Sequence, residues 1–205
     1  ETVERLTGHI KIRRDGAGAH HLSHKAVWRL LASLLGRKPA DVDVVTVYLG
    51  KGFSLALHRE GRTAAVINTF SGIPSTSRCG PLELPLLLDA IMNDEISFKE
   101  LEAATFTKGG LLSLAGTDDF RTLDAFRRKG ATLAQQKKIE LLYDFFARKA
   151  AAGILALTAD GRPVEYVVLT GGLVDSPDLV GRIEANIAGR WPVVLVPGTI
   201  EQESL

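Results

Sequence analysis

Two short segments carry side chains suited to holding an anion. Arg78 lies among hydroxyl residues in Ser75-Thr76-Ser77-Arg78-Cys79-Gly80, where a guanidinium could clamp a carboxylate or a phosphate. A solvated loop arginine is the plain alternative. His20-His21-Leu22-Ser23-His24 gathers three of the five histidines, and His20 could donate to an anionic transition state. A zinc site is not expected, because no third ligand and no His-Glu-X-X-His pattern accompany the cluster.

The turn Gly50-Lys51-Gly52 is a candidate phosphate-binding loop. Apolar, strand-like segments flank it on both sides, so it predicts a hairpin and not the strand–loop–helix of a Walker or Rossmann site. Glycine allows backbone N–H groups to converge on a phosphate. Most turns of this composition are only turns, so the motif carries little weight alone.

Two further turns could enclose a nucleoside. Leu169-Thr170-Gly171-Gly172 ends a predicted strand and leads into a helix capped by Asp175 or Ser176. Ligands of open α/β sheets bind outside the carboxyl ends of strands, near helix N-termini; the alternative is a tight loop without a ligand. Asp119 could accept from a ribose hydroxyl, and Arg121 could cover a base or pair with phosphate. Such a pattern more often forms a helix cap with a surface ion pair.

Other reactive groups give weaker signals. Cys79 is the only cysteine and has no recognisable acid–base partner, which argues against a nucleophile, an internal disulfide and a cysteine-ligated zinc. The chain has no Gly-X-Ser-X-Gly elbow, so the simplest hydrolase interpretation fails. Glu201 and Glu203 lie near the end, where a tail of solvated acids is the default expectation.

Composition predicts an ordinary globular protein. The chain has 205 residues, 45% hydrophobic and 24% charged, with 25 basic and 24 acidic side chains and a net charge of +1. That balance argues against a nucleic-acid partner. No apolar run is long enough to cross a membrane, and no signal peptide is recognisable, so we expect a cytoplasmic protein. The chain begins at Glu1, and we expect further sequence before it.

Hydrophobic periodicity predicts the elements that would position these residues. A helix capped by Ser23 and stopped by Gly36 precedes three strands that form an antiparallel meander. Helices follow, the longest capped by Thr132, and then a β-α-β unit. The predicted strands span residues 42–49, 53–58, 63–68, 164–169 and 193–196. The two shorter predicted helices span residues 82–92 and 98–103. This order predicts one α/β domain with a mixed sheet.

Taken in order, the motifs resemble the C-terminal part of the acetate and butyrate kinase family, and butyrate kinases most of all. The resemblance covers nearly the whole chain and implies the superfamily of sugar kinases and actin, with a ribonuclease H-like, actin-like ATPase lobe. The segments that carry it are His20-His21-Leu22-Ser23-His24-Lys25-Ala26-Val27, Tyr48-Leu49-Gly50-Lys51-Gly52-Phe53-Ser54, Ser77-Arg78-Cys79-Gly80, Lys108-Gly109-Gly110-Leu111, Gly116-Thr117-Asp118-Asp119-Phe120-Arg121, Leu169-Thr170-Gly171-Gly172-Leu173 and Pro197-Gly198-Thr199-Ile200-Glu201-Gln202-Glu203.

The resemblance implies transfer of the ATP γ-phosphoryl group to a short-chain carboxylate, with Mg²⁺, in a homodimer. On this hypothesis Arg78 holds the carboxylate and the transferring group, and His20 donates to the phosphoryl oxygens. Glu201 would orient Mg²⁺ or its waters, although Glu203 could take that place after a small shift. Contacts with the nucleotide are expected from Leu49, Gly50, Lys51, Gly52, Asp119, Phe120, Arg121, Gly171, Gly172, Leu173, Val174, Asp175 and Ser176.

The chain departs from the family pattern at two positions. Tyr48 replaces the usual His, and Lys51 stands where Gly or Asn is usual, so it could add a phosphate contact or crowd the loop. We also expect residues 1–205 to be one lobe of two, without the first lobe and therefore inactive alone. The alternative hypotheses are a degenerate nucleotide-binding or dimerisation module of the same fold, and a kinase for a longer or branched acid.

Overall fold

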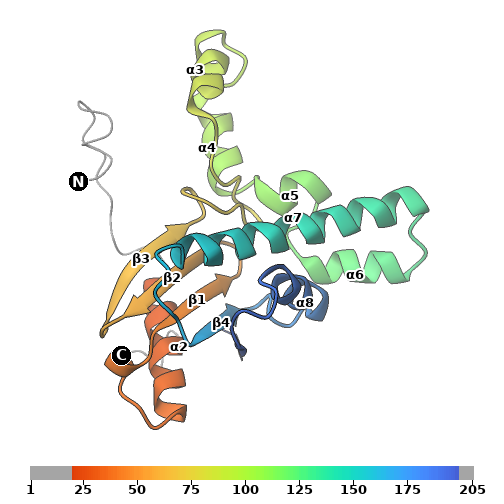
Figure 1. Ribbon diagram of the computed structural model, residues 1–205. Coiled ribbons are helices and arrows are strands. Elements are labelled where there is room, and N and C mark those ends of the chain that lie inside the picture. Colours follow the sequence, from red (N-terminus) through yellow and green to blue (C-terminus); the bar gives the residue numbers. More distant parts are fainter. Residues whose placement is uncertain (1–19, 199–205) are drawn as a thin grey trace.

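A five-stranded mixed sheet forms the centre of the computed structural model, which describes residues 20–198 (Figure 1). The strands are β1 (Val44–Leu49), β2 (Phe53–Arg59), β3 (Arg62–Asn68), β4 (Tyr166–Gly171) and β5 (Val193–Pro197), in the order β3-β2-β1-β4-β5. β1–β2 and β2–β3 are antiparallel, whereas β1–β4 and β4–β5 are parallel. The predicted meander and β-α-β unit are both confirmed.

Helices cover both faces of this sheet. The helical elements are α2 (His21–Leu34), a 3₁₀ turn (Pro39–Asp41), α3 (Leu84–Met92), α4 (Phe98–Phe106), α5 (Gly110–Ala115), α6 (Phe120–Arg128), α7 (Leu133–Leu157) and α8 (Pro177–Asn186). All six residues of β1 are buried. Because alternate side chains of a strand point to opposite faces, both faces of β1 are covered. Val45 and Val47 pack on the α7–α8 side, and Val44 packs with α2.

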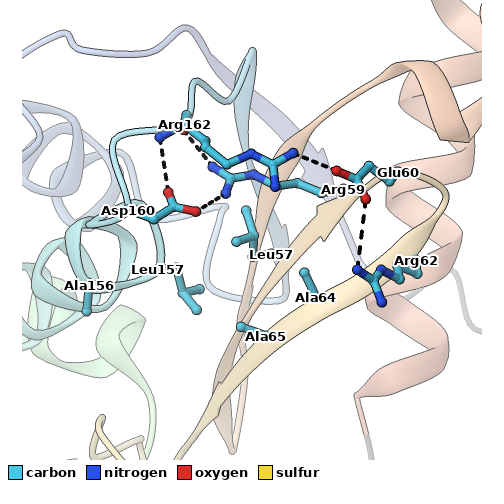
Figure 2. Close-up of a pocket in the computed structure, with 10 residues that line it drawn as sticks. All are labelled: Leu57, Arg59, Glu60, Arg62, Ala64, Ala65, Ala156, Leu157, Asp160 and Arg162. Carbon is cyan, nitrogen blue, oxygen red and sulfur yellow. Dashed lines mark hydrogen bonds and ion pairs between the residues drawn. The ribbon is translucent and has the colours of Figure 1, made fainter.

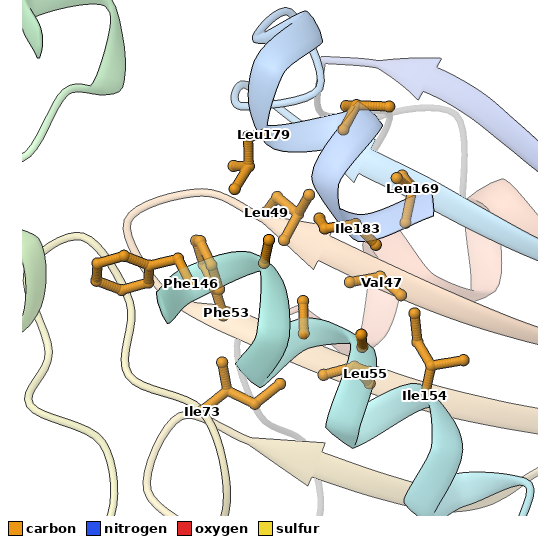
Figure 3. Packing of buried hydrophobic residues seen from close by; sticks show 14 of the residues in the cluster. Val47, Leu49, Phe53, Leu55, Ile73, Phe146, Ile154, Leu169, Leu179 and Ile183 are labelled. Carbon is orange, nitrogen blue, oxygen red and sulfur yellow. The ribbon is translucent and has the colours of Figure 1, made fainter. Parts of the chain in front are cut away.

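The larger core lies between the sheet and the long helix α7. Figure 3 shows Phe146 and Ile154 of α7 directed at Phe53 and Leu55 of β2. These four side chains are at most 1% exposed, and burying a large apolar side chain is worth about 1.5–3 kcal/mol. A Cβ atom at Gly153 would lie 3.0 Å from a methyl of Leu55, so glycine allows α7 to approach β2 closely.

The predicted helix ends are confirmed only in part. The helices predicted over 82–92 and 98–103 span Leu84–Met92 and Phe98–Phe106. Ser97 and Thr132 each cap a helix through a reciprocal capping box, and Ser176 is the N-cap of α8. The first helix begins at His21, not after Ser23. Ser23 is 1% exposed and lies within α2, because packing of α2 on the sheet overrides the local capping preference.

Helices α3 and α4 extend away from the sheet as an arm (Figure 1). Neither helix has a buried residue, and α3 exposes Leu84, Leu86, Leu88 and Met92. A helix with several exposed large apolar side chains is unusual for a free surface. In residues 20–198 no helix is long and apolar enough to span a membrane.

Candidate functional site

The carboxyl ends of β1 and β4 bring two of the predicted glycine turns together. β1 and β4 are parallel, with Tyr48 beside Thr170, so both strands end at the same edge of the sheet. Leu173 donates its backbone N–H to the carbonyl oxygen of Leu49 at 3.1 Å. Gly171 has φ +98°, and a Cβ there would lie 2.8 Å from the carbonyl carbon of Leu49. Only glycine fits this close approach.

The hydroxyl-rich loop is fastened to the β1–β2 hairpin. Ser75 Oγ donates to the carbonyl oxygen of Lys51 at 2.6 Å, and Ser77 Oγ donates to the same oxygen at 3.3 Å. Arg78 follows directly and extends over Gly52: a Cβ added to Gly52 would lie 3.0 Å from Cζ of Arg78. The loop hydroxyls therefore position Arg78, which is not a freely solvated loop residue.

His20 approaches the same glycine. A Cβ at Gly52 would lie 2.9 Å from Cε1 of His20. Nδ1 of His20 is 2.8 Å from Ser54 Oγ, and the ring stacks on Tyr48 with centroids 4.0 Å apart. The two predicted catalytic side chains, 58 positions apart in the sequence, thus meet above the predicted phosphate-binding hairpin.

A glycine pair supports the loop that carries Arg78. Gly109 donates its N–H to the carbonyl oxygen of Ser77 at 3.0 Å. Gly110 has φ +59°, and a Cβ there would collide with the carbonyl oxygen of Ser75 and lie 2.7 Å from that of Arg78. Sequence reasoning grouped this pair with the nucleotide-binding turn; its contacts give it a supporting role beneath Arg78.

The turn that contains Asp119 is a helix cap with an ion pair. Asp119 Oδ1 accepts from the backbone N–H of Arg121 at 2.9 Å, and the two side chains pair at 2.9 Å. The hydrogen bond from Arg121 lowers the pKa of the Asp119 carboxyl. Asp119 and, more weakly, Asp175 raise the pKa of Arg121. The carboxylate of Asp175, in one predicted nucleoside segment, thus attracts the guanidinium of Arg121 in the other.

The predicted nucleotide contacts differ in what they can offer. Phe120 and Val174 are buried in the main core, so only their backbones could meet a ligand. A Cβ at Gly172 would meet no atom within 4 Å, which leaves room beside the α8 N-terminus. Lys51 Nζ lies 3.9 Å from Asp118 Oδ2, and the Lys51 side chain is 85% exposed. Lys51 therefore bridges toward the Asp119 turn and does not crowd the hairpin.

Neither a thiol nor a metal cluster adds chemistry in the described part of the chain. Burial raises the pKa of the Cys79 thiol, and Cys79 Sγ donates to the carbonyl oxygen of Gly80 at 3.1 Å, so Cys79 is not a ready nucleophile. Residues 20–198 contain no group of three or more His, Cys, Asp or Glu that could hold a metal ion. The predicted Mg²⁺ residue Glu201, like Glu203, lies outside the described residues.

A separate cavity of about 290 Å³ lies at the opposite end of the sheet, beside the β2–β3 turn (Figure 2). Arg59 is buried there and pairs with Asp160, while Arg162 donates to Glu60 at 2.7 Å. Arg59 also donates to the carbonyl oxygen of Arg162 at 2.6 Å. These ion pairs tie the hairpin to the segment after α7, and Nε of Arg59, which has no hydrogen-bond partner among the described residues, lies 3.6 Å from Asp43 Oδ2. We therefore assign the cavity a structural role.

Comparison with known proteins finds relatives along nearly the whole chain. A model described as the acetokinase family matches residues 3–186. A probable butyrate kinase of Phocaeicola vulgatus is 31% identical over 207 residues, which covers 100% of this chain and 57% of that protein. Butyrate kinase 1 of Clostridium acetobutylicum is 29% identical, covering 98% of this chain and 56% of that protein. The chain therefore spans little more than half the length of these relatives.

A solved structure supports the same fold. The crystal structure of acetate kinase from Entamoeba histolytica superposes with a TM-score of 0.78 at 16% identity, over 95% of this chain and 59% of that one. At this identity the likeness concerns the fold alone. The expected actin-like ATPase lobe, a mixed sheet with flanking helices, is confirmed.

Proposed function

The chain belongs to the acetokinase family, and we propose that the whole protein transfers the γ-phosphoryl group of ATP to a short-chain, butyrate-like carboxylate. A carboxylate oxygen attacks the γ-phosphorus, the bond to the bridging oxygen of ADP breaks, and an acyl phosphate and ADP leave. Such a transfer depends on positioning and on stabilising charge, with little covalent chemistry for the protein. The names of the butyrate kinase relatives support this choice of acid.

The observation that carries this proposal is the convergence of Arg78 and His20 on Gly52. Arg78 would neutralise the carboxylate and the transferring phosphoryl group, and His20 would donate to its equatorial oxygens. The bare backbone of Gly50 to Gly52 would present N–H groups to the phosphates. A side chain at Gly52 would occupy the space that both catalytic groups need.

The two departures from the family pattern are compatible with a working site. Tyr48 gives His20 a stacking partner at 4.0 Å between centroids, so it supports the ring that is proposed to act. Lys51 extends toward Asp118, where its charge would add to phosphate binding. These contacts favour an enzyme over the degenerate nucleotide-binding or dimerisation module.

The adenosine would lie between the Asp119–Arg121 turn and the Gly171–Ser176 turn. The open space at Gly172 and the N-terminus of α8 support this position. Mg²⁺ typically keeps several waters and binds through phosphates plus one or two carboxylates. Glu201 remains the predicted carboxylate, and the described residues contain no group of three or more His, Cys, Asp or Glu that could hold a metal ion. Bound Mg²⁺ would neutralise phosphate charge.

Acyl phosphate formation tests the proposal directly. The whole protein would be incubated with ATP, Mg²⁺ and acetate, propionate, butyrate, isobutyrate or a longer acid, and hydroxylamine would trap the acyl phosphate as a hydroxamate. ATP-dependent hydroxamate with a short-chain acid is expected, greatest near butyrate. Nucleotide binding without hydroxamate from any acid would instead support the degenerate module.

The homodimer is part of the same proposal. The exposed leucines of α3 support an interface through the α3–α4 arm, since burying them would recover hydrophobic free energy. Light scattering should give a dimer for the whole protein and a monomer for Leu86→Glu. If Leu86→Glu remains a dimer, the dimer interface does not depend on this face of α3.

A further inference from the structure

Behind His20, a row of buried polar side chains runs along the α2 face of the sheet. Ser54 Oγ lies 2.8 Å from Nδ1 of His20 and 2.8 Å from Nε2 of His24. Thr46 Oγ1 lies 2.7 Å from Nδ1 of His24 and 2.9 Å from Nε2 of His58. All four residues behind His20 are buried. Hydrogen bonds therefore connect the proposed catalytic ring to two rings that touch no substrate.

The two inner rings are neutral. Burial, together with the repulsion that a protonated His58, His20 or His21 would exert, lowers the pKa of His24 to about 3. Burial, with the charges of His21 and Lys25, lowers the pKa of His58 to about 3 as well. A neutral imidazole donates from one nitrogen and accepts at the other. The direction of the hydrogen bond at one nitrogen of a ring therefore fixes the direction of the hydrogen bond at its other nitrogen.

The distances favour one direction for the row. The single hydroxyl proton of Thr46 has three acceptors: Nδ1 of His24 at 2.7 Å, Nε2 of His58 at 2.9 Å and the carbonyl oxygen of Ala56 at 3.4 Å. The shortest contact assigns it to His24. Nε2 of His24 then carries the proton and donates to Ser54, and Ser54 donates to Nδ1 of His20.

We propose that His24, acting through Ser54, holds the proton of neutral His20 on Nε2, so that His20 meets a phosphoryl oxygen as a hydrogen-bond donor. His24 and Ser54 are then positioning residues, because they act through His20. In the reverse direction, with Thr46 donating to His58 or to Ala56, the proton of His20 would lie on Nδ1 and a lone pair would face the anion. That His20 donates to a phosphoryl oxygen rests on the proposed kinase function, whereas the proton positions assigned to His20 and His24 do not depend on it.

Nitrogen NMR of the histidine rings tests the proposal without an activity assay. The whole protein would be labelled with ¹⁵N-histidine and recorded at about pH 8, above the ordinary imidazole pKa of about 6.5. Long-range ¹H–¹⁵N spectra show which ring nitrogen carries the proton. We expect Nε2–H for both His24 and His20. In Ser54→Ala the Nε2 preference of His20 should be lost while that of His24 remains.

Two variants separate positioning from stability. Ser54→Thr keeps the hydroxyl and should restore the Nε2 proton on His20. Thr69→Val removes another buried hydroxyl, which bonds only to the backbone of Phe53, with its Oγ1 2.7 Å from the carbonyl oxygen. This control should leave the His20 spectrum unchanged. Melting temperatures of all variants report the structural cost.

Several results would overturn the proposal. A proton on Nδ1 of either His20 or His24 in the wild-type chain contradicts the assigned direction, and this holds even if Ser54→Ala fails to fold. An unchanged His20 spectrum in folded Ser54→Ala contradicts control through Ser54. In the whole protein, Ser54→Ala should lower kcat by about tenfold, the loss of roughly one hydrogen bond, with the ADP dissociation constant unchanged. A whole protein with no kinase activity but the expected spectra would refute the proposed function and leave the proton assignment intact.

Discussion

The substitution Gly52→Ala should damage the proposed site while leaving the fold intact. The added methyl would lie 3.0 Å from Cζ of Arg78 and 2.9 Å from Cε1 of His20. Both contacts are with the far ends of side chains, which can move at small cost. The backbone at Gly52 is not in the left-handed region, so alanine brings no backbone strain. We therefore expect a folded protein whose two catalytic groups have moved apart.

The size of the effect follows from the overlap. Carbon atoms in ordinary contact are about 3.5–4.0 Å apart, so the guanidinium must retreat by roughly 0.5–1 Å. A displacement of about 1 Å at a reacting group costs about 10²-fold in rate, or about 2.7 kcal/mol of transition-state stabilisation. The melting temperature should change little, because no buried group loses its partner.

The assay compares kcat for acyl phosphate formation by the whole protein with and without Gly52→Ala. Gly181→Ala is the matched control: Gly181 lies in α8 with no atom within 4 Å of an added Cβ. The control should keep full activity and gain about 1 kcal/mol of stability from helix propensity. Full activity in Gly52→Ala would refute the placement of Arg78 and His20 above the hairpin.

Three further predictions follow from the same structure. Gly172→Val should fold normally, because a Cβ there meets no protein atom within 4 Å, yet bind ADP at least about tenfold more weakly by calorimetry; unchanged affinity would contradict the adenosine position. Gly171→Ala should instead lower the free energy of unfolding by more than about 2 kcal/mol in urea titrations, since φ is +98° and the Cβ would press on the backbone of Leu49; a neutral effect would contradict the close approach. Because the pKa values of His24 and His58 are about 3 in the folded chain and about 6.5 when unfolded, stability is fully present above pH 6.5 and falls as the pH drops from 6.5 toward 3. The two rings together should cost about 3 kcal/mol between about pH 7.5 and 5.5, and His58→Gln should halve that loss; a flat profile would contradict their neutral burial.

Local sequence patterns predicted most of the fold. The β-branched run of β1, the Gly50-Lys51-Gly52 turn and the capping residues Ser97 and Thr132 are determined within a few neighbouring positions. The same local reasoning misplaced the start of α2. Its first residues are set by packing on the sheet, which no local pattern contains.

The site could be predicted only in part. Arg78 and His20 stood out by residue type, but the reason that they meet at Gly52 lies in long-range contacts. The sequence also did not reveal His24 as a partner of Ser54, because 30 positions separate them. Periodicity reports one element at a time, whereas this contact depends on how α2 lies across β2. The sequence also could not show that the side chain of Phe120 is buried in the larger core.

The most direct test of the central claim is the rate of butyryl phosphate formation by the whole protein with Arg78→Ala. The account predicts that kcat falls by at least about 10²-fold, while the melting temperature and the ADP affinity stay near those of the wild type. Wild-type kcat in Arg78→Ala would contradict the account, because phosphoryl transfer would then proceed without the group assigned to hold the carboxylate and the phosphoryl group.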